Sequence, residues 1–118
     1  MKFKREIAKQ AVLEYIKKYR GVTYVDIEKI FDRMGFDWQG NATTNLTGFY
    51  NIIIWDGWNE EAFAIINDLL IAGKITRVST SIIVYLADGK ALSYPIANKA
   101  LQYKEAHWLP VVFNICEE

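Results

Sequence analysis

The chain has 118 residues, of which 52% are hydrophobic and 14% aromatic, so a single domain over residues 1–118 with a substantial apolar core is expected. Fourteen basic and fourteen acidic side chains cancel to a net charge of zero. This balance excludes the overall positive charge with which most nucleic-acid-binding domains attract phosphate groups.

The cysteine content and the hydropathy pattern bear on the cellular compartment. Cys116 is the single cysteine of the sequence, which excludes an internal disulfide, and no Cys/His cluster has the spacing of a zinc site. The N-terminus has no apolar signal core, and no apolar run approaches the roughly 20 residues that cross a bilayer. We therefore expect a cytoplasmic protein without a membrane segment, a metal or a cofactor.

The N-terminal third predicts two helices. Apolar residues recur at helical spacing over residues 4–20, and a glycine follows as a natural stop. Thr23 is a good N-cap, and Asp26 three residues later completes the pattern of a capping box. A second helix is therefore expected over about residues 24–34.

The next segment differs in composition from the helices. Residues 37–48 are crowded with glycine, asparagine and threonine, which predicts a mobile loop. Residues 50–55 include three consecutive isoleucines and predict a strand buried on both faces, which Asp56-Gly57 is expected to end. Together they predict an inserted loop and strand at about 36–58.

A third helix is expected over residues 60–72, which are almost entirely apolar. Asn59 suits the N-cap position, and Gly73 can adopt the left-handed conformation that ends many helices. Because apolar side chains lie on nearly all sides of this helix, we expect it to be buried nearly all round and to be the most buried helix of the fold.

The C-terminal part is rich in β-branched residues. Residues 75–78 and 82–86 predict an antiparallel hairpin, and a third strand is expected at about 90–92 after an Asp-Gly turn. Residues 111–115 predict a terminal strand. The segment 96–107 is compatible with either a short helix or an irregular crossing.

The order of these elements, with the run Leu-Leu-Ile-Ala-Gly-Lys-Ile at 69–75 before a strand, resembles the winged-helix family. The resemblance covers about residues 4–87. It implies an α+β fold with three helices and a small antiparallel sheet, to which this chain adds a C-terminal β extension. The insertion at 36–58 and a very short wing depart from the family pattern. In general character the chain also resembles small accessory proteins of bacterial phages and mobile elements.

The winged-helix resemblance implies that the third helix reads DNA. In this chain, however, that helix carries Glu60, Glu61 and Asp68 and neither lysine nor arginine, and acidic groups repel phosphates. Contacts to nucleic acid would have to come from the first helix and the predicted hairpin, through Lys17, Lys18, Arg20, Lys74 and Arg77. A DNA-binding regulator of this kind is the alternative function.

The residue types of catalytic sites are sparse. His107 is the single histidine of the sequence, and neither it nor Cys116 has a recognisable partner that could act as a base or an orienting acid. The glutamates near the start of the third helix are explained by the helix dipole and do not match a calcium loop. We therefore expect no enzymatic activity.

The aromatic residues around the predicted strand at 50–55 indicate a different kind of function. Aromatic residues placed like this usually belong to the core or anchor a loop, but tryptophan and tyrosine also often anchor protein interfaces. We predict a non-enzymatic binding or regulatory module that acts through a protein partner, with Trp58, Trp55, Trp38 and Tyr50 at the contact. Trp58 lies at a corner between strand and helix and is expected to be partly exposed.

Overall fold

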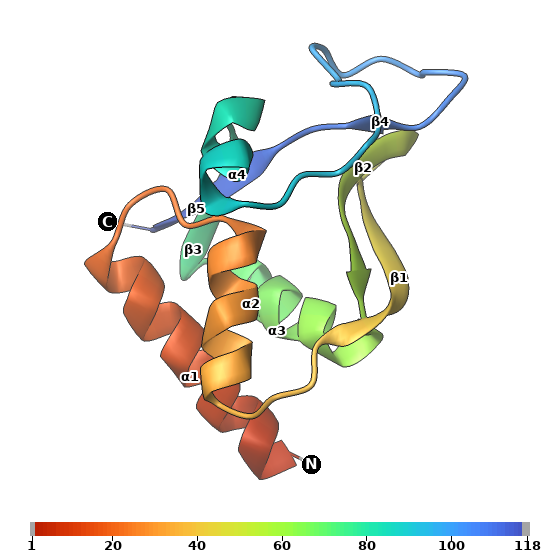
Figure 1. Ribbon diagram of the computed structural model, residues 1–118. Coiled ribbons are helices and arrows are strands. Elements are labelled where there is room, and N and C mark those ends of the chain that lie inside the picture. The colour runs from red at the N-terminus through yellow and green to blue at the C-terminus, as the bar shows by residue number, and fades with distance from the viewer. Residues whose placement is uncertain (1, 117–118) are drawn as a thin grey trace.

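The computed structural model describes the backbone of residues 2–116 and the side chains of residues 4–116. Four helices form within this part of the chain: α1 (Lys2–Lys18), α2 (Tyr24–Arg33), α3 (Glu60–Ile71) and α4 (Ile82–Asp88). Figure 1 shows α2 in front of α3, with α1 on one side and a β-hairpin on the other. None of the described helices is long and apolar enough to span a bilayer.

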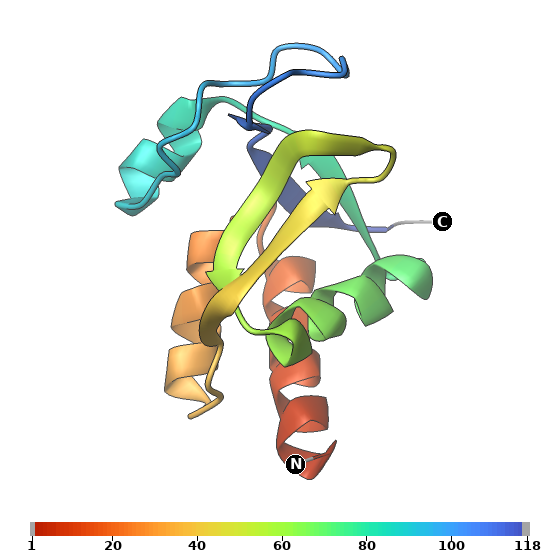
Figure 2. The same cartoon turned by 90° about the vertical axis from the view of Figure 1, so that its right-hand side faces the viewer.

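The strands form two small sheets, which confirms the α+β class. They are β1 (Gln39–Leu46), β2 (Phe49–Trp58), β3 (Ile75–Ser79), β4 (His107–Trp108) and β5 (Val111–Ile115). In one sheet β2 pairs antiparallel with β1 and parallel with β4; in the other, β3 pairs antiparallel with β5. Figure 2 shows the β1–β2 hairpin starting beside α2 and α3 and extending past them.

The first two helices confirm the sequence prediction. The Thr23 hydroxyl accepts a hydrogen bond from the Asp26 amide at 3.1 Å, and the Asp26 carboxylate accepts one from the Thr23 amide at 3.2 Å. This capping box begins α2 at Tyr24 as predicted. Helix α1 begins two residues earlier and ends two residues earlier than the predicted range of 4–20.

Helix α3 has its predicted start, but it is not buried all round. The Asn59 side chain accepts a hydrogen bond from the Ala62 amide at 2.8 Å, and Gly73 follows the helix with a φ of +70°. Ile71, however, is 86% exposed, and Leu70 is only partly buried. The helix packs one face against the rest of the fold, so its outer apolar side chains meet solvent.

Of the described helices, α2 has the largest buried share, which corrects the prediction for α3. Its buried residues are Tyr24, Val25, Ile27, Glu28, Ile30 and Phe31. This helix contacts both α1 and α4, and its side chains also meet aromatic rings of β2. The apolar content of a helix therefore does not by itself predict how much of that helix is buried.

The prediction that residues 37–48 form a loop is wrong, because most of this segment is strand β1. The polar composition disfavours a strand locally, but β2 offers a pairing edge, and a tertiary pairing of this kind overrides weak β propensity. A Cβ atom at Gly40 would lie 2.7 Å from the Asn59 Cα, so only glycine allows β1 to approach the start of α3 this closely. Strand β2 also continues through Asp56-Gly57 to Trp58, with Gly57 at a φ of +85°.

Of the two strands predicted for a hairpin at 75–78 and 82–86, the first is confirmed and the second is wrong. Its first strand is β3, but the second is helix α4, and residues 90–92 are irregular. The Ser81 hydroxyl caps α4 by accepting from the Ile83 amide at 3.1 Å, and Gly89 ends it in the left-handed conformation. Strand β3 pairs instead with the C-terminal strand, which forms at 111–115 as predicted.

The segment 96–107, which the sequence left open between two structures, is the irregular crossing. It is tied down at one end by a bridge between Ile96 and Trp108, and the Ala97 amide donates to the Trp108 carbonyl at 2.8 Å. The indole of Trp108 is fully buried and donates to the Ile54 carbonyl at 3.1 Å. The crossing is therefore buried only where it joins the sheet that contains β2.

Two isoleucines of α3 test this description of its packing. Ile65 is fully buried, and we expect Ile65→Ala to lower the free energy of unfolding by about 2 to 5 kcal/mol because it removes buried apolar atoms and leaves a cavity. Ile71→Ala, at the exposed position, is the matched control and should change stability by no more than about 0.5 kcal/mol. Urea denaturation followed by circular dichroism measures both; similar losses for the two variants would contradict the one-sided packing of α3.

Candidate binding surfaces

The four aromatic residues predicted to bind a partner lie in different environments. Trp55 and Trp58 are fully buried, so the expectation that Trp58 is partly exposed is wrong. Trp38 is half-buried, and Tyr50 is 82% exposed. Strand β2 extends to Trp58, so this residue lies inside the fold instead of at an outer corner.

The two buried tryptophans share one hydrogen-bond acceptor on α2. The indole N–H of Trp58 donates to the Glu28 carboxylate at 2.8 Å, and that of Trp55 donates to the same oxygen at 3.1 Å. Tyr24 stacks on Trp55 with ring centroids 5.4 Å apart and meets Trp58 edge-on at 5.2 Å. A buried indole needs a partner for its polar N–H group, and Glu28 supplies it here.

Glu28 is itself buried and is paired with a cation. It is 5% exposed, and both of its carboxylate oxygens lie 3.0 Å from the Lys90 ammonium. That ammonium also lies 5.0 Å from the centre of the Trp38 ring and 5.5 Å from that of Trp55. We call the five residues Glu28, Trp38, Trp55, Trp58 and Lys90 the Glu28 cluster.

Neither Glu28 nor Lys90 was singled out from the sequence. One signal for Glu28 was available: Tyr24, Ile27 and Phe31 form an apolar stripe at helical spacing, and Glu28 occupies the remaining position of that stripe. A carboxylate in such a stripe needs a buried partner. No comparable signal marks Lys90, because only the packing of the chain brings residue 90 beside α2.

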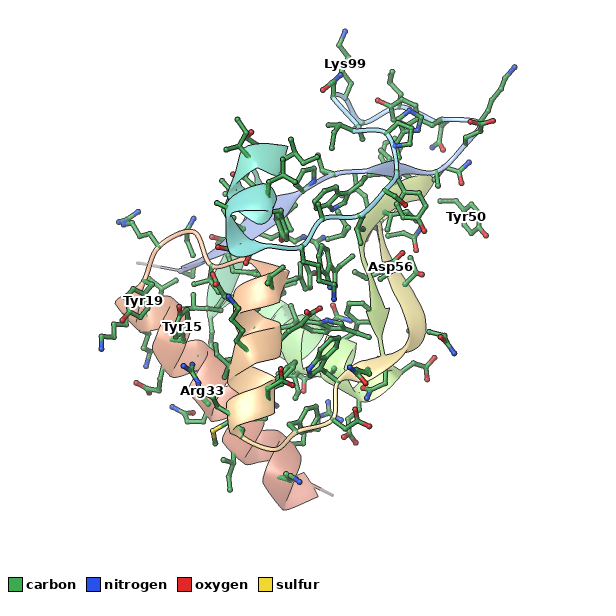
Figure 3. All side chains as sticks on the ribbon, in the orientation of Figure 1. Tyr15, Tyr19, Arg33, Tyr50, Asp56 and Lys99 are labelled. Atoms are coloured by element: carbon green, nitrogen blue, oxygen red, sulfur yellow. The ribbon has the colours of Figure 1, made fainter. Side chains whose placement is uncertain are left out.

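Tyr50 lies beside a shallow groove at the far end of the hairpin. This hairpin groove has a volume of about 270 Å³ and is lined by Thr43, Asn45, Tyr50, Asn51, Ile53 and Ala106. Figure 3 shows the Tyr50 side chain pointing away from the body of the molecule.

Two side chains hold the hairpin tip against the neighbouring crossing. The Asn51 amide donates to the Tyr103 carbonyl, and the Gln102 amide donates to the Gly48 carbonyl, both at 2.8 Å. Asn45 adds a hydrogen bond within the hairpin by donating to the Tyr50 carbonyl. The hairpin groove therefore lies at a seam between segments that are distant in the sequence.

A second groove gathers two of the basic residues that the sequence singled out. This basic groove has a volume of about 460 Å³ and is lined by Leu13, Lys17, Ala72, Gly73, Lys74, Ile115 and Cys116. It lies where the ends of α1 and α3 meet the end of β5. Lys17 comes from α1 and Lys74 follows α3, so only the tertiary structure places the two ammonium groups on one groove.

The other three predicted contacts to nucleic acid do not line the basic groove. Lys18 and Arg20 are exposed near the end of α1, and Arg77 is half-buried on β3. Burial raises the pKa of Tyr24 to about 12, and the nearby Arg77 side chain opposes this rise. Arg77 is therefore directed in part towards the core.

The acidic surface predicted for α3 is partly neutralised by α1. Asp68 lies 2.9 Å from the Arg5 guanidinium and 3.0 Å from the Lys9 ammonium. Hydrogen bonds from Lys9 and then from Arg5 hold the pKa of the Asp68 carboxyl below its usual range, and the same contact raises the pKa of Lys9. These two cations are thus engaged within the fold and hold α1 against α3.

Residues that could support catalysis are dispersed. Within the described chain, no three of the His, Cys, Asp and Glu side chains come close enough together to hold a metal ion. The His107 ring stacks on Tyr103 with centroids 3.8 Å apart, and its Nδ1 atom lies 2.8 Å from the Glu105 carbonyl oxygen. Cys116 is exposed at the edge of the basic groove.

Comparison of the chain with protein-family models, with curated proteins and with solved structures yields no significant match.

The burial of Trp58 generates a prediction about stability. We expect Trp58→Ala to lower the free energy of unfolding by about 3 to 5 kcal/mol, because it removes a fully buried ring. Trp58→Phe retains an aromatic ring but removes one donor from Glu28, and it should cost about 1 to 3 kcal/mol. The matched control is Tyr50→Ala at the exposed tyrosine, which should cost no more than about 0.5 kcal/mol. Chemical denaturation measures all three, and a Trp58→Ala variant as stable as the wild type would contradict the packing.

Proposed function

We propose that this protein is a non-enzymatic binding module that acts through a protein partner, and that the hairpin groove is the contact surface. The observation that carries the proposal is the 82% exposure of Tyr50 beside that groove. The neighbouring tryptophans Trp55 and Trp58 are fully buried, whereas this large aromatic side chain is left in solvent. Tyrosine suits such a role because its ring contributes apolar contact and its hydroxyl contributes a hydrogen bond.

The surroundings of Tyr50 support the same proposal. Leu101, in the crossing tied to the hairpin tip, is 51% exposed and adds an apolar side chain at this end of the molecule. Hydrogen bonds on both sides of the seam hold the surface in place before a partner arrives. Such preorganisation lowers the entropy lost on binding. Of the four residues predicted as contacts, Tyr50 is the one that lies at the centre of the proposed contact surface.

The proposed architecture is a winged-helix-like core with two insertions. Val22 pairs antiparallel with Phe113 of β5, and β5 pairs antiparallel with β3. Helices α1, α2 and α3 precede β3 in the order expected of that family, which supports the proposal. The β1–β2 hairpin would be the first insertion, and residues 80–110 would replace the short wing expected from the sequence. The likeness to phage and mobile-element accessory proteins stays a prediction.

The first insertion bears on how such a core could act. In a DNA-binding helix-turn-helix, a short turn sets the recognition helix against its neighbour. Here the whole β1–β2 hairpin separates α2 from α3. The hairpin therefore presents a new surface at the place where the family has a turn, and this favours a protein contact over groove insertion by α3.

Substitution of two exposed tyrosines tests the proposed surface. Tyr50→Ala should abolish most partner capture from an extract of the source cell, because it removes the central aromatic contact. Tyr19→Ala is the matched control; Tyr19 is 47% exposed and lies on the opposite side of the molecule (Figure 3). Both variants should keep the wild-type circular dichroism spectrum. Equal capture by the two variants would rule out the hairpin groove as the contact.

Nucleic-acid binding is the second candidate, and the basic groove is the observation that favours it. Lys17 and Lys74 meet there although they are far apart in the sequence. Two ammonium groups on one groove could neutralise neighbouring phosphates, and such binding weakens steeply as salt is raised.

Retention on DNA resin at several salt concentrations distinguishes the two candidates. Because the net charge is zero, we expect weak retention that the reversal K17E/K74E reduces no more than the control reversal K99E/K104E. Lys99 and Lys104 are exposed and lie in the crossing, away from the lining of the basic groove. Strong, salt-sensitive retention that only K17E/K74E removes would establish the basic groove as a nucleic-acid contact.

A further inference from the structure

The environment of the Lys90 ammonium has the composition of an ammonium-binding cage. The Glu28 carboxylate contacts it through both oxygens at 3.0 Å, and the faces of Trp38 and Trp55 lie at 5.0 and 5.5 Å. A carboxylate with two aromatic faces is the combination with which proteins recognise alkylated ammonium groups, through charge and cation–π attraction. In this protein the cage is filled by a side chain of its own chain.

The cage is held in shape by contacts that do not involve Lys90. Two indole N–H groups, from Trp55 and Trp58, bind one oxygen of Glu28. The Trp38 indole donates to the Asp32 carboxylate at 2.8 Å, which orients the outer wall. Removing the Lys90 ammonium would therefore leave a carboxylate that is still hydrogen-bonded and two rings that are still positioned.

The occupant is held less firmly than the walls. The Lys90 side chain is 42% exposed, whereas that of Glu28 is 7% exposed, so the cage opens to solvent on the side from which Lys90 enters. Lys90 directly follows the Gly89 cap of α4 and begins the irregular part of the chain. Its amide makes a long hydrogen bond of 3.3 Å to the Tyr85 carbonyl. Withdrawal of the side chain would cost its contacts in the cage but would break no helix or strand.

We propose that this cage is a binding site for the substituted ammonium group of an external ligand, and that Lys90 is an internal occupant which the ligand displaces. The exchange replaces one ion pair with another, so the buried charge of Glu28 is paired with a cation both before and after it. Methylation of the ligand ammonium favours the exchange, because a methylated cation is more easily desolvated and keeps its attraction to the indole faces. The site is separate from the hairpin groove and does not depend on it.

Lys90 sets the affinity of the site by competing with the ligand. A tethered group competes at an effective concentration on the order of millimolar, so simple amines at low concentration would not displace it. The apparent affinity for a ligand equals the intrinsic affinity of the free cage multiplied by the fraction of molecules in which the cage is free. Removal of the internal competitor should consequently strengthen binding of an external ammonium.

Titrations monitored by tryptophan fluorescence test the inference. The probes are choline and a capped Nε-trimethyl-lysine, each compared with its neutral tert-butyl isostere. We expect saturable binding of the charged probes to the wild type and binding about tenfold or more tighter to K90A, because no internal ammonium competes. K90M keeps an apolar stem against the indoles and serves if K90A is unstable. The variant E28Q/K90A should lose the preference for charge over the neutral isostere.

Each outcome decides for or against the cage. Tighter binding of the capped trimethyl-lysine than of choline would assign the ligand to a protein side chain, and the reverse order to a small molecule. Equal affinity of wild type and K90A, equal binding of the neutral isosteres, or no saturable binding by either protein would overturn the inference. If neither K90A nor K90M folds, Lys90 is required by the fold itself and the inference is likewise overturned.

Discussion

The buried carboxylate of Glu28 is the constraint on which the rest of this structure depends. A carboxylate that is 5% exposed must be compensated by cations or hydrogen-bond donors, because the cost of burying an unpaired charge is large. The donors come from Trp55 and Trp58 on β2 and from Lys90 after α4. One side chain of α2 thereby joins the β1–β2 hairpin and the irregular segment after α4 to the helical core.

This constraint also decides which aromatic side chains remain at the surface. Hydrogen bonds to Glu28 and ring contacts with Tyr24 engage Trp55 and Trp58 inside the fold. Tyr50 lies near the opposite end of β2, beyond the reach of the helices, and is left exposed. The base of the hairpin is buried in the core, whereas its tip extends beyond the core. The proposed contact surface is therefore exposed because the hairpin is long.

Helix caps could be predicted from the sequence more reliably than structure that depends on long-range pairing. The capping box at Thr23 and Asp26 and the Asn59 cap were identified correctly, because a cap depends on residues within one turn of the helix. The segments 37–48 and 82–86 were assigned wrongly. The first became a strand because β2 lies beside it, and the second became α4 through its own caps despite β-branched composition.

The sequence by itself determined the α+β class, the boundaries of α1, α2 and α3 within a few residues, and the terminal strand β5. It also identified Tyr50, Lys17 and Lys74 as chemically suitable for binding. Only the tertiary structure decided which of these side chains meet solvent, which basic residues share a groove, and that Lys90 enters a cage around Glu28. The physical reason is that periodicity and capping act over a few residues, whereas burial and ion pairing depend on segments brought together from distant parts of the chain.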